Sequence, residues 1–278
     1  MTHPDSPAST PETRRGRRRK VRDSGATKQA LAQLPWDQPR YLDPPVEPVG
    51  LEGTQRIHEA AMQILEEIGI DFLHDQARDV LAAAGCTVTE PSPTVRMDRD
   101  FVMEQVNKAP NHVSLTPRNQ DRRLMFGKDL AAFGLVSSPP NVSDLDNGRR
   151  VGNRKDYQDF LRLAQTFDCI HFTGGYPVEP IDIHPSIRHL DCLFDLLTLT
   201  DKLVHAYSLG VERVEDAMEM VRIAGGFSHS EFEQSPKMFT NINSSSPLKH
   251  DWPMLDGAMR LARRNQLVII TPFTLSGA

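Results

Sequence analysis

The chain of 278 residues contains no apolar run of about 18 residues, so the sequence predicts no membrane-spanning helix. Its first residues lack the apolar core of a secretory signal peptide, and we therefore expect a cytoplasmic protein. Only three cysteines are present, Cys86, Cys169 and Cys192, and none has the paired spacing of a zinc site. They are predicted to be reduced, buried thiols.

Motifs for phosphate and metal binding are also missing. Gly174-Gly175 matches neither of the common glycine-rich phosphate loops. Four residues, Asp182, His184, His189 and Asp191, lie close together in the sequence. Because the two histidines are five residues apart, they do not stack on one helical face, and no metal site is predicted.

Acidic residues outnumber basic ones outside one short stretch. Arg14–Arg22 holds seven basic residues and no acid, so removing it takes the formal charge from −5 to −12. Nucleic acid is therefore not an expected partner of the acidic remainder. Residues 1–48, rich in Pro, Ser, Thr and Arg, are predicted to be a disordered tail. Its basic cluster is interpreted as a solubilising extension, with attraction of nucleic acid or an acidic protein as the alternative.

Residues 49–130 predict a small α+β region. Apolar spacing indicates a helix over 51–68 with Gly69 in a left-handed cap, and another over 75–84 that ends at Gly85. A strand at 86–89, a helix at 99–108 and a two-stranded hairpin at 112–116 and 123–127 follow.

From residue 131 onward, strands and helices alternate. Five strands are predicted, beginning at Ala131, Cys169, Leu203, Lys237 and Leu267, and a polar loop with Asp146-Asn147-Gly148 follows the first. Helices are predicted at 153–167, 185–201, 211–224 and 254–264. Five β/α repeats favour parallel pairing and an incomplete TIM-type (β/α)8 barrel over residues 131–278.

A closed barrel of this type needs eight strands and typically about 250 residues, whereas only 148 residues remain from Ala131 to the end. We therefore expect the chain to be the N-terminal portion of a longer protein, with exposed strand edges that favour association into homo-oligomers. The alternative is an open five-stranded α/β sheet of flavodoxin-like order.

The active site of a barrel faces the carboxyl ends of its strands, where polar residues cluster in this sequence. The candidate substrate-binding residues are Asn241, Asn243, Ser244, Ser246, Thr271 and Thr274. The competing interpretation is that they cap helices or satisfy loop backbone.

Two histidines within predicted strands, His171 and His205, are further candidates, although a strand histidine is more often a hydrogen-bonded core residue. Aromatic residues near the strands suit an aromatic cage for a methylated ammonium, with core packing as the alternative: Phe133, Phe172, Tyr176, Tyr207, Phe239 and Phe273.

Several segments in order resemble the trimethylamine:corrinoid methyltransferase family. They are Ile64-Leu-Glu-Glu-Ile-Gly-Ile, Gly148-Arg149-Arg150, Val178-Glu-Pro-Ile-Asp-Ile-His-Pro, Asn243-Ser-Ser-Ser-Pro-Leu and Thr271-Pro-Phe-Thr-Leu-Ser-Gly-Ala. The resemblance covers the chain from about Leu51 to its last residue.

The resemblance implies a barrel enzyme that moves a methyl group from a methylated amine, such as trimethylamine or glycine betaine, to the cobalt of a corrinoid. The corrinoid would be carried by a separate partner protein and not bound tightly by this chain. The group around His184 could contact that partner at the barrel mouth. Catalytic residues, including the pyrrolysine of some members, are expected beyond this chain and stay unassigned. The alternatives are a barrel fragment that only binds quaternary amines or a partner, and a non-functional truncation.

Overall fold

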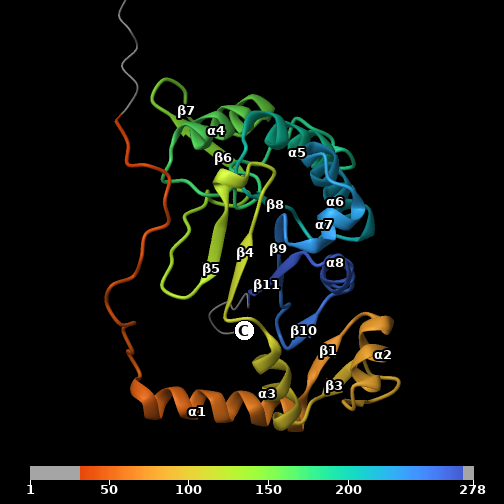
Figure 1. Cartoon of the computed structure of the whole chain (residues 1–278). Coiled ribbons are helices and arrows are strands. Elements are labelled where there is room, and N and C mark those ends of the chain that lie inside the picture. Colours follow the sequence, from red (N-terminus) through yellow and green to blue (C-terminus); the bar gives the residue numbers. More distant parts are fainter. Residues whose placement is uncertain (1–31, 272–278) are drawn as a thin grey trace, which may run out of the picture. The chain divides into compact units, whose positions relative to one another are not determined.

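A computed structural model describes residues 32–271 (Figure 1). From Leu34 onward these residues belong to one compact unit with a mixed α/β fold. Three predicted features, the basic cluster Arg14–Arg22 and the candidates Phe273 and Thr274, lie outside the described residues. None of the helices within 32–271 is long and apolar enough to cross a membrane.

Three strands form a parallel sheet in the order β11-β9-β8. They are β8 (Val204–His205), β9 (Met238–Asn243) and β11 (Leu267–Thr271). Single parallel bridges join Leu203 to Phe172 and Phe172 to Gly134, so all five predicted strand segments are parallel neighbours in chain order. This order contradicts the flavodoxin-like alternative, in which the first strand lies between the second and the third. Among residues 32–271 the sheet does not close into a barrel.

Helices alternate with these segments close to the predicted bounds. They are α4 (Arg154–Thr166), α5 (Arg188–Leu199), α6 (Val211–Gly225) and α8 (Trp252–Arg263). Each packs on the next: α4 on α5, α5 on α6, and α6 on α8 (Figure 1). The short α7 (His229–Gln234) was not predicted, although Ser228 and Glu231 form the capping box that starts it.

The two faces of the parallel sheet carry separate cores. Alternate residues of a strand point to opposite faces, and on β9 Met238 joins a cluster formed with α4, α5, α6 and α8. Phe239 faces the other way and packs on Leu115 and Leu124. These leucines belong to the predicted hairpin, which consists of β4 (His112–Leu115) and β5 (Leu124–Gly127). The first parallel segment, with its bridge at Gly134, follows this hairpin in the chain. We call the side that bears Phe239 the inner face.

The region before the hairpin contains the predicted helices α1 (Gly50–Gln63, continued by the π-helical turn Ile64–Ile68), α2 (Asp75–Ala83) and α3 (Arg99–Lys108). Its small sheet holds β1 (Ile70–Phe72), β2 (Thr87–Val88) and β3 (Thr94–Arg96), of which only β2 was predicted. β1 also pairs in parallel with β10 (Lys249–His250), a contact between distant parts of the chain.

Gly69 ends the first helix as predicted, with a φ of 88°, but its ψ of −179° is extended and not that of a left-handed helical cap. A Cβ at this position would lie 2.6 Å from the Val95 carbonyl oxygen. The close approach to β3 therefore requires glycine.

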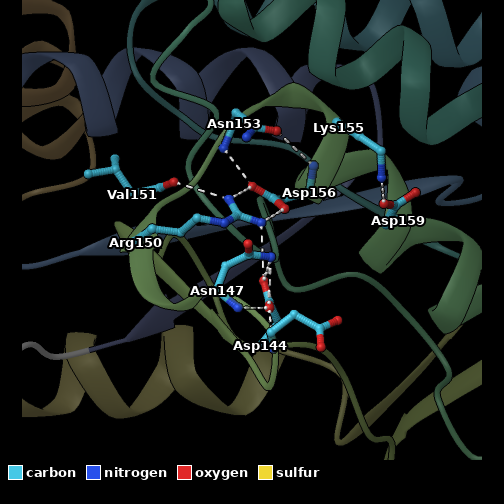
Figure 2. A network of polar contacts seen from close by, with 9 residues as sticks. Asp144, Asn147, Arg150, Val151, Asn153, Lys155, Asp156 and Asp159 are labelled. Atoms are coloured by element: carbon cyan, nitrogen blue, oxygen red, sulfur yellow. Dashed lines mark hydrogen bonds and ion pairs between the residues drawn. The ribbon is translucent and has the colours of Figure 1, made fainter.

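The polar loop predicted around Asp146-Asn147-Gly148 is instead the turn of a hairpin of β6 (Asn141–Asp144) and β7 (Gly148–Val151). Gly148 has a φ of +66°, and the Asp144 carboxylate accepts hydrogen bonds from the backbone of the turn. Figure 2 shows how Arg150 joins this hairpin to α4 through two bonds to Asp156, of 2.6 and 2.7 Å. The Arg150 hydrogen bonds hold the pKa of Asp156 below its usual value.

The predicted tail reaches residue 48, but the segment near Trp36 packs on the described body. Trp36 lies in the inner-face core, and the Arg122 guanidinium sits 4.4 Å from its ring centroid. The Gln38 side chain exchanges hydrogen bonds with the Met125 backbone. Isolated prolines break helices without preventing an extended segment from packing, so composition alone places the start of the body too late.

A buried lysine closes the amino end of the sheet. Lys202 is 2% exposed and its ammonium donates to the carbonyl oxygens of Ala164, Phe167 and Ile170. It thereby ties the end of α4 to the strand segment that follows.

All three cysteines are free. Cys192 is buried, and burial raises the pKa of its thiol to about 12. The predicted buried setting is wrong for Cys169, which is exposed, and Cys86 is only partly buried.

Candidate functional site

The inner face changes from apolar to polar along the strand direction. In register across β9 and β11, Phe239 pairs with Leu267, Asn241 with Ile269, and Asn243 with Thr271. The first pair packs on the β4–β5 hairpin, whereas the last lies at the carboxyl end of both strands. The carboxyl half of this face is therefore the candidate site, as the positions of the amides predict.

His205 of β8 lies beside Phe239 and is 6% exposed. Its ring centroid is 4.9 Å from that of Phe239 and 5.4 Å from that of Tyr207. Neither ring nitrogen has a hydrogen-bond partner among the residues that the structure describes. Burial lowers the pKa of His205 to about 4, so the imidazole is neutral at pH 7.

A second polar group without a partner is found on the neighbouring strand. Asn241 Oδ1 is buried and accepts no hydrogen bond from the described part of the chain. Buried polar atoms are nearly always satisfied, so each exception requires an explanation such as a ligand or a water molecule. His205 and Asn241 lie on the same face of the adjacent strands β8 and β9.

Asn243 and Thr271 are brought together as well. The Thr271 hydroxyl donates to Asn243 Oδ1 at 2.6 Å and also lies 3.3 Å from the Ile242 carbonyl oxygen. This bond orients the Asn243 amide at the carboxyl edge. Ser244 follows β9 and is half-buried, whereas Ser246 is exposed in the next loop.

His171 does not belong to the site. Its Nδ1 accepts a hydrogen bond from the Phe133 N–H at 2.9 Å, which leaves Nε2 as the donor to the Asp37 carbonyl oxygen at 3.0 Å. Its ring also contacts Trp36. His171 is thus the hydrogen-bonded core histidine of the competing interpretation, whereas His205 is not.

Tyr207 connects the inner face to the loops beyond it. Its hydroxyl lies 2.5 Å from Ser138 Oγ and accepts the Tyr176 N–H at 3.0 Å. A Cβ at Gly175 would lie 2.2 Å from the Tyr207 hydroxyl oxygen, so the glycine pair permits this approach. Sequence reasoning missed Ser138, because a serine in a strand-end Ser-Ser-Pro-Pro run gives no sign of its partner.

The four residues around His184 that are close together in the sequence make separate contacts in the structure. Asp182 accepts a hydrogen bond from the Arg154 N–H at 2.8 Å, and Asp191 pairs with the Arg154 side chain at 3.3 Å. His184 Nδ1 contacts Ser186 Oγ, and His189 Nε2 contacts Asp216 Oδ2, at 2.7 and 2.8 Å. Asp182 and His184 lie in the loop before α5, whereas His189 and Asp191 belong to α5 itself.

Together, the sequential parallel sheet and the helices that alternate with it define a β/α protein, whose candidate site is an aromatic and amide-bearing face of that sheet. The chain belongs to the trimethylamine methyltransferase family, because the family model described as "Trimethylamine methyltransferase (MTTB)" matches residues 14–278.

Three relatives agree with this assignment. A glycine betaine methyltransferase of Desulfitobacterium hafniense (strain Y51) is 34% identical over 225 residues, which cover 81% of this chain and 46% of the relative. A proline betaine:corrinoid methyltransferase of Eubacterium limosum is 24% identical over 231 residues, covering 80% and 46%. The trimethylamine methyltransferase MttB of D. hafniense (strain DSM 10664 / DCB-2) is 24% identical over 214 residues, covering 73% and 42%. The chain thus spans about half the length of the curated relatives it matches.

Proposed function

We propose that the polypeptide containing these residues transfers a methyl group from a methylated amine to the cobalt of a corrinoid carried by a separate protein. The amine would be trimethylamine or a betaine-like quaternary ammonium. Family membership supports the reaction class. The observation that carries the assignment of the site is the pair of unpartnered groups, His205 and Asn241, beside aromatic rings on the inner face.

The chemistry of these side chains suits a methylated ammonium. A neutral His205 does not repel a cation, and the faces of Phe239 and Tyr207 attract one. The Asn241 amide oxygen offers a partial negative charge without the nucleophilicity of a carboxylate. Burial of the ligand against these groups would exclude water and fix the direction of its methyl groups.

The corrinoid supplies the nucleophile that accepts the methyl group, while the bonding electrons stay on the amine nitrogen. Within residues 32–271 no group of three or more His, Cys, Asp or Glu is placed to hold a metal ion. We therefore propose none of these residues as a cobalt ligand. The role of this part of the protein is to bind and orient the amine.

We also propose that the five parallel segments belong to a (β/α)8 barrel, preceded by the α+β region over residues 49–130. The sequential strand order and the chain of packed helices support this arrangement.

The experiment is a methyl-transfer assay. The purified polypeptide is mixed with its corrinoid protein, in the reduced state, and with a panel of methylated amines, and methyl–cobalt formation is followed by absorbance. Asn241→Leu, which keeps the volume and removes the amide, should lower kcat/KM by about tenfold or more, as expected for a lost polar contact to a reacting group. The exposed Asn107→Leu is the matched control. No transfer with any amine would contradict the proposal, and calorimetric binding without transfer would favour a purely binding protein.

A further inference from the structure

Ser138 has a backbone conformation that is uncommon for a residue with a side chain. Its φ is +51°, in the left-handed region where serine is strained and glycine is favoured. Such conformations persist where surrounding contacts impose them, and they concentrate at functional sites. The Ser138 N–H donates to the Tyr176 carbonyl oxygen at 2.6 Å, and its Oγ lies 2.5 Å from the Tyr207 hydroxyl oxygen. The strained residue thus contacts an aromatic side chain of the proposed amine site directly.

The Tyr207 hydroxyl is held from two sides. Besides the Ser138 contact, it accepts the backbone N–H of Tyr176 at 3.0 Å. Because the phenol oxygen already accepts this bond, its own O–H is free to donate to Ser138 Oγ. The backbone bond is present whatever side chain stands at residue 138, whereas the bond to Oγ is lost when the Ser138 hydroxyl is removed. A single substitution can therefore release one side of the phenol.

The Tyr207 ring borders the inner face. Its centroid is 5.4 Å from that of His205, and the two ring planes meet at 85°. His205 pairs in register with Phe239, and neither of its ring nitrogens has a partner within residues 32–271. Along the chain Tyr207 is two residues beyond His205, just as Asn241 is two residues beyond Phe239. The ring therefore lies next to the part of this face that is proposed to bind the ammonium.

From these contacts we infer that Ser138 is a positioning residue, whose hydroxyl fixes the orientation of the Tyr207 ring beside His205. This inference rests on the proposed function and extends it to a residue of the loop that follows the first parallel segment. The attraction between a cation and an aromatic ring depends on orientation, since the face of the ring is negative and its edge positive. The left-handed backbone at Ser138 brings the hydroxyl within reach of the phenol.

The first measurement needs no ligand. The chain has four tyrosines, so protein labelled with 3-fluorotyrosine gives a simple fluorine NMR spectrum, in which Tyr207→Phe identifies the Tyr207 resonance. Ser138→Ala should shift or broaden that resonance, because the phenol loses a hydrogen-bond partner and the ring gains freedom. Ser143→Ala, at an exposed serine, is the matched control and should leave it unchanged.

The second measurement is calorimetric titration of the purified polypeptide with tetramethylammonium. Ser138→Ala and Tyr207→Phe should each raise the Kd by about threefold to tenfold, as expected for a weakened contact between a cation and a ring. The double variant should bind no more weakly than either single variant, because both substitutions remove the same hydrogen bond. Ser138→Gly also lacks the hydroxyl but suits the positive φ. It should weaken binding equally, yet unfold at a higher urea concentration than Ser138→Ala.

The outcomes separate this inference from the proposed function. An unchanged Tyr207 resonance in Ser138→Ala, or an unchanged Kd in both Ser138 variants, would overturn the positioning role and leave the amine site standing. Additive losses in the double variant would do the same. No binding of tetramethylammonium by the unaltered protein would overturn both. Since Ser138→Gly relieves the strained φ, the inference stays falsifiable if Ser138→Ala fails to fold.

Discussion

Single residues decide where the site is, and the two strand histidines show why the sequence does not identify them. Both were predicted within short apolar strands; in the structure His205 lies in β8, and His171 precedes the isolated bridge residue Phe172. They differ in their hydrogen bonds: the ring nitrogens of His171 bond a backbone N–H and a carbonyl oxygen, whereas those of His205 have no partner among residues 32–271. Those partners come from distant segments, so no local pattern separates a satisfied histidine from an unsatisfied one.

The lowered pKa of His205 makes a prediction about acid stability. The native group titrates near pH 4, whereas the unfolded one titrates near 6.5, so the unfolded state binds more protons between these values. The free energy of unfolding should therefore fall as the pH drops from about 6.5 to about 4, with a His205 contribution of up to about 3 kcal/mol.

Urea denaturation across this pH range measures the effect. His205→Phe removes the titrating group and should make the pH dependence shallower; the partly buried His250, whose pKa burial also lowers, keeps part of the slope. The exposed His58→Gln is the control and should follow the unaltered protein. An identical slope in His205→Phe would show that His205 is not buried as a neutral group.

At the scale of elements, the sequence predicts most helices and the sequential strands because both depend on local spacing of apolar residues. α3 matches its predicted bounds, and α4 differs by one residue at each end. Among the elements that were missed, β1, β3 and β10 are only two or three residues long. They exist through pairing with distant partners, which periodicity does not reveal.

The cap of α4 gives a prediction at this scale. The Asn153 side chain accepts the Asp156 N–H at 3.0 Å, and the Asp156 carboxylate accepts the Asn153 N–H at 3.2 Å (Figure 2). Asn153→Ala should lower the free energy of unfolding by about 1 kcal/mol, because a backbone donor loses its partner. The measurement is a urea titration, with Asn153→Asp as the capping-competent control. Unchanged stability in Asn153→Ala would mean that Arg150 and Asp156 hold the helix start without the cap.

On the scale of the whole molecule, composition places the start of the body too late. The composition of the segment around Trp36 predicts a tail. In the structure the Trp36 ring nevertheless joins the inner-face core, and the Gln38 side chain forms hydrogen bonds with the Met125 backbone. The sequence likewise predicts only part of the candidate site. The positions of the polar residues at the strand ends were predicted, whereas the contact of Ser138 with Tyr207 forms only because distant segments converge in three dimensions.

The central claim is that the inner face at the carboxyl end of the parallel strands binds a methylated ammonium. A crystal structure of the purified polypeptide with trimethylglycine bound tests it most directly. The account predicts the ammonium nitrogen within about 6 Å of the Phe239 or Tyr207 ring centroid, on the side of His205 and Asn241. An ammonium bound on the helix-covered face, or elsewhere away from these rings, would contradict it.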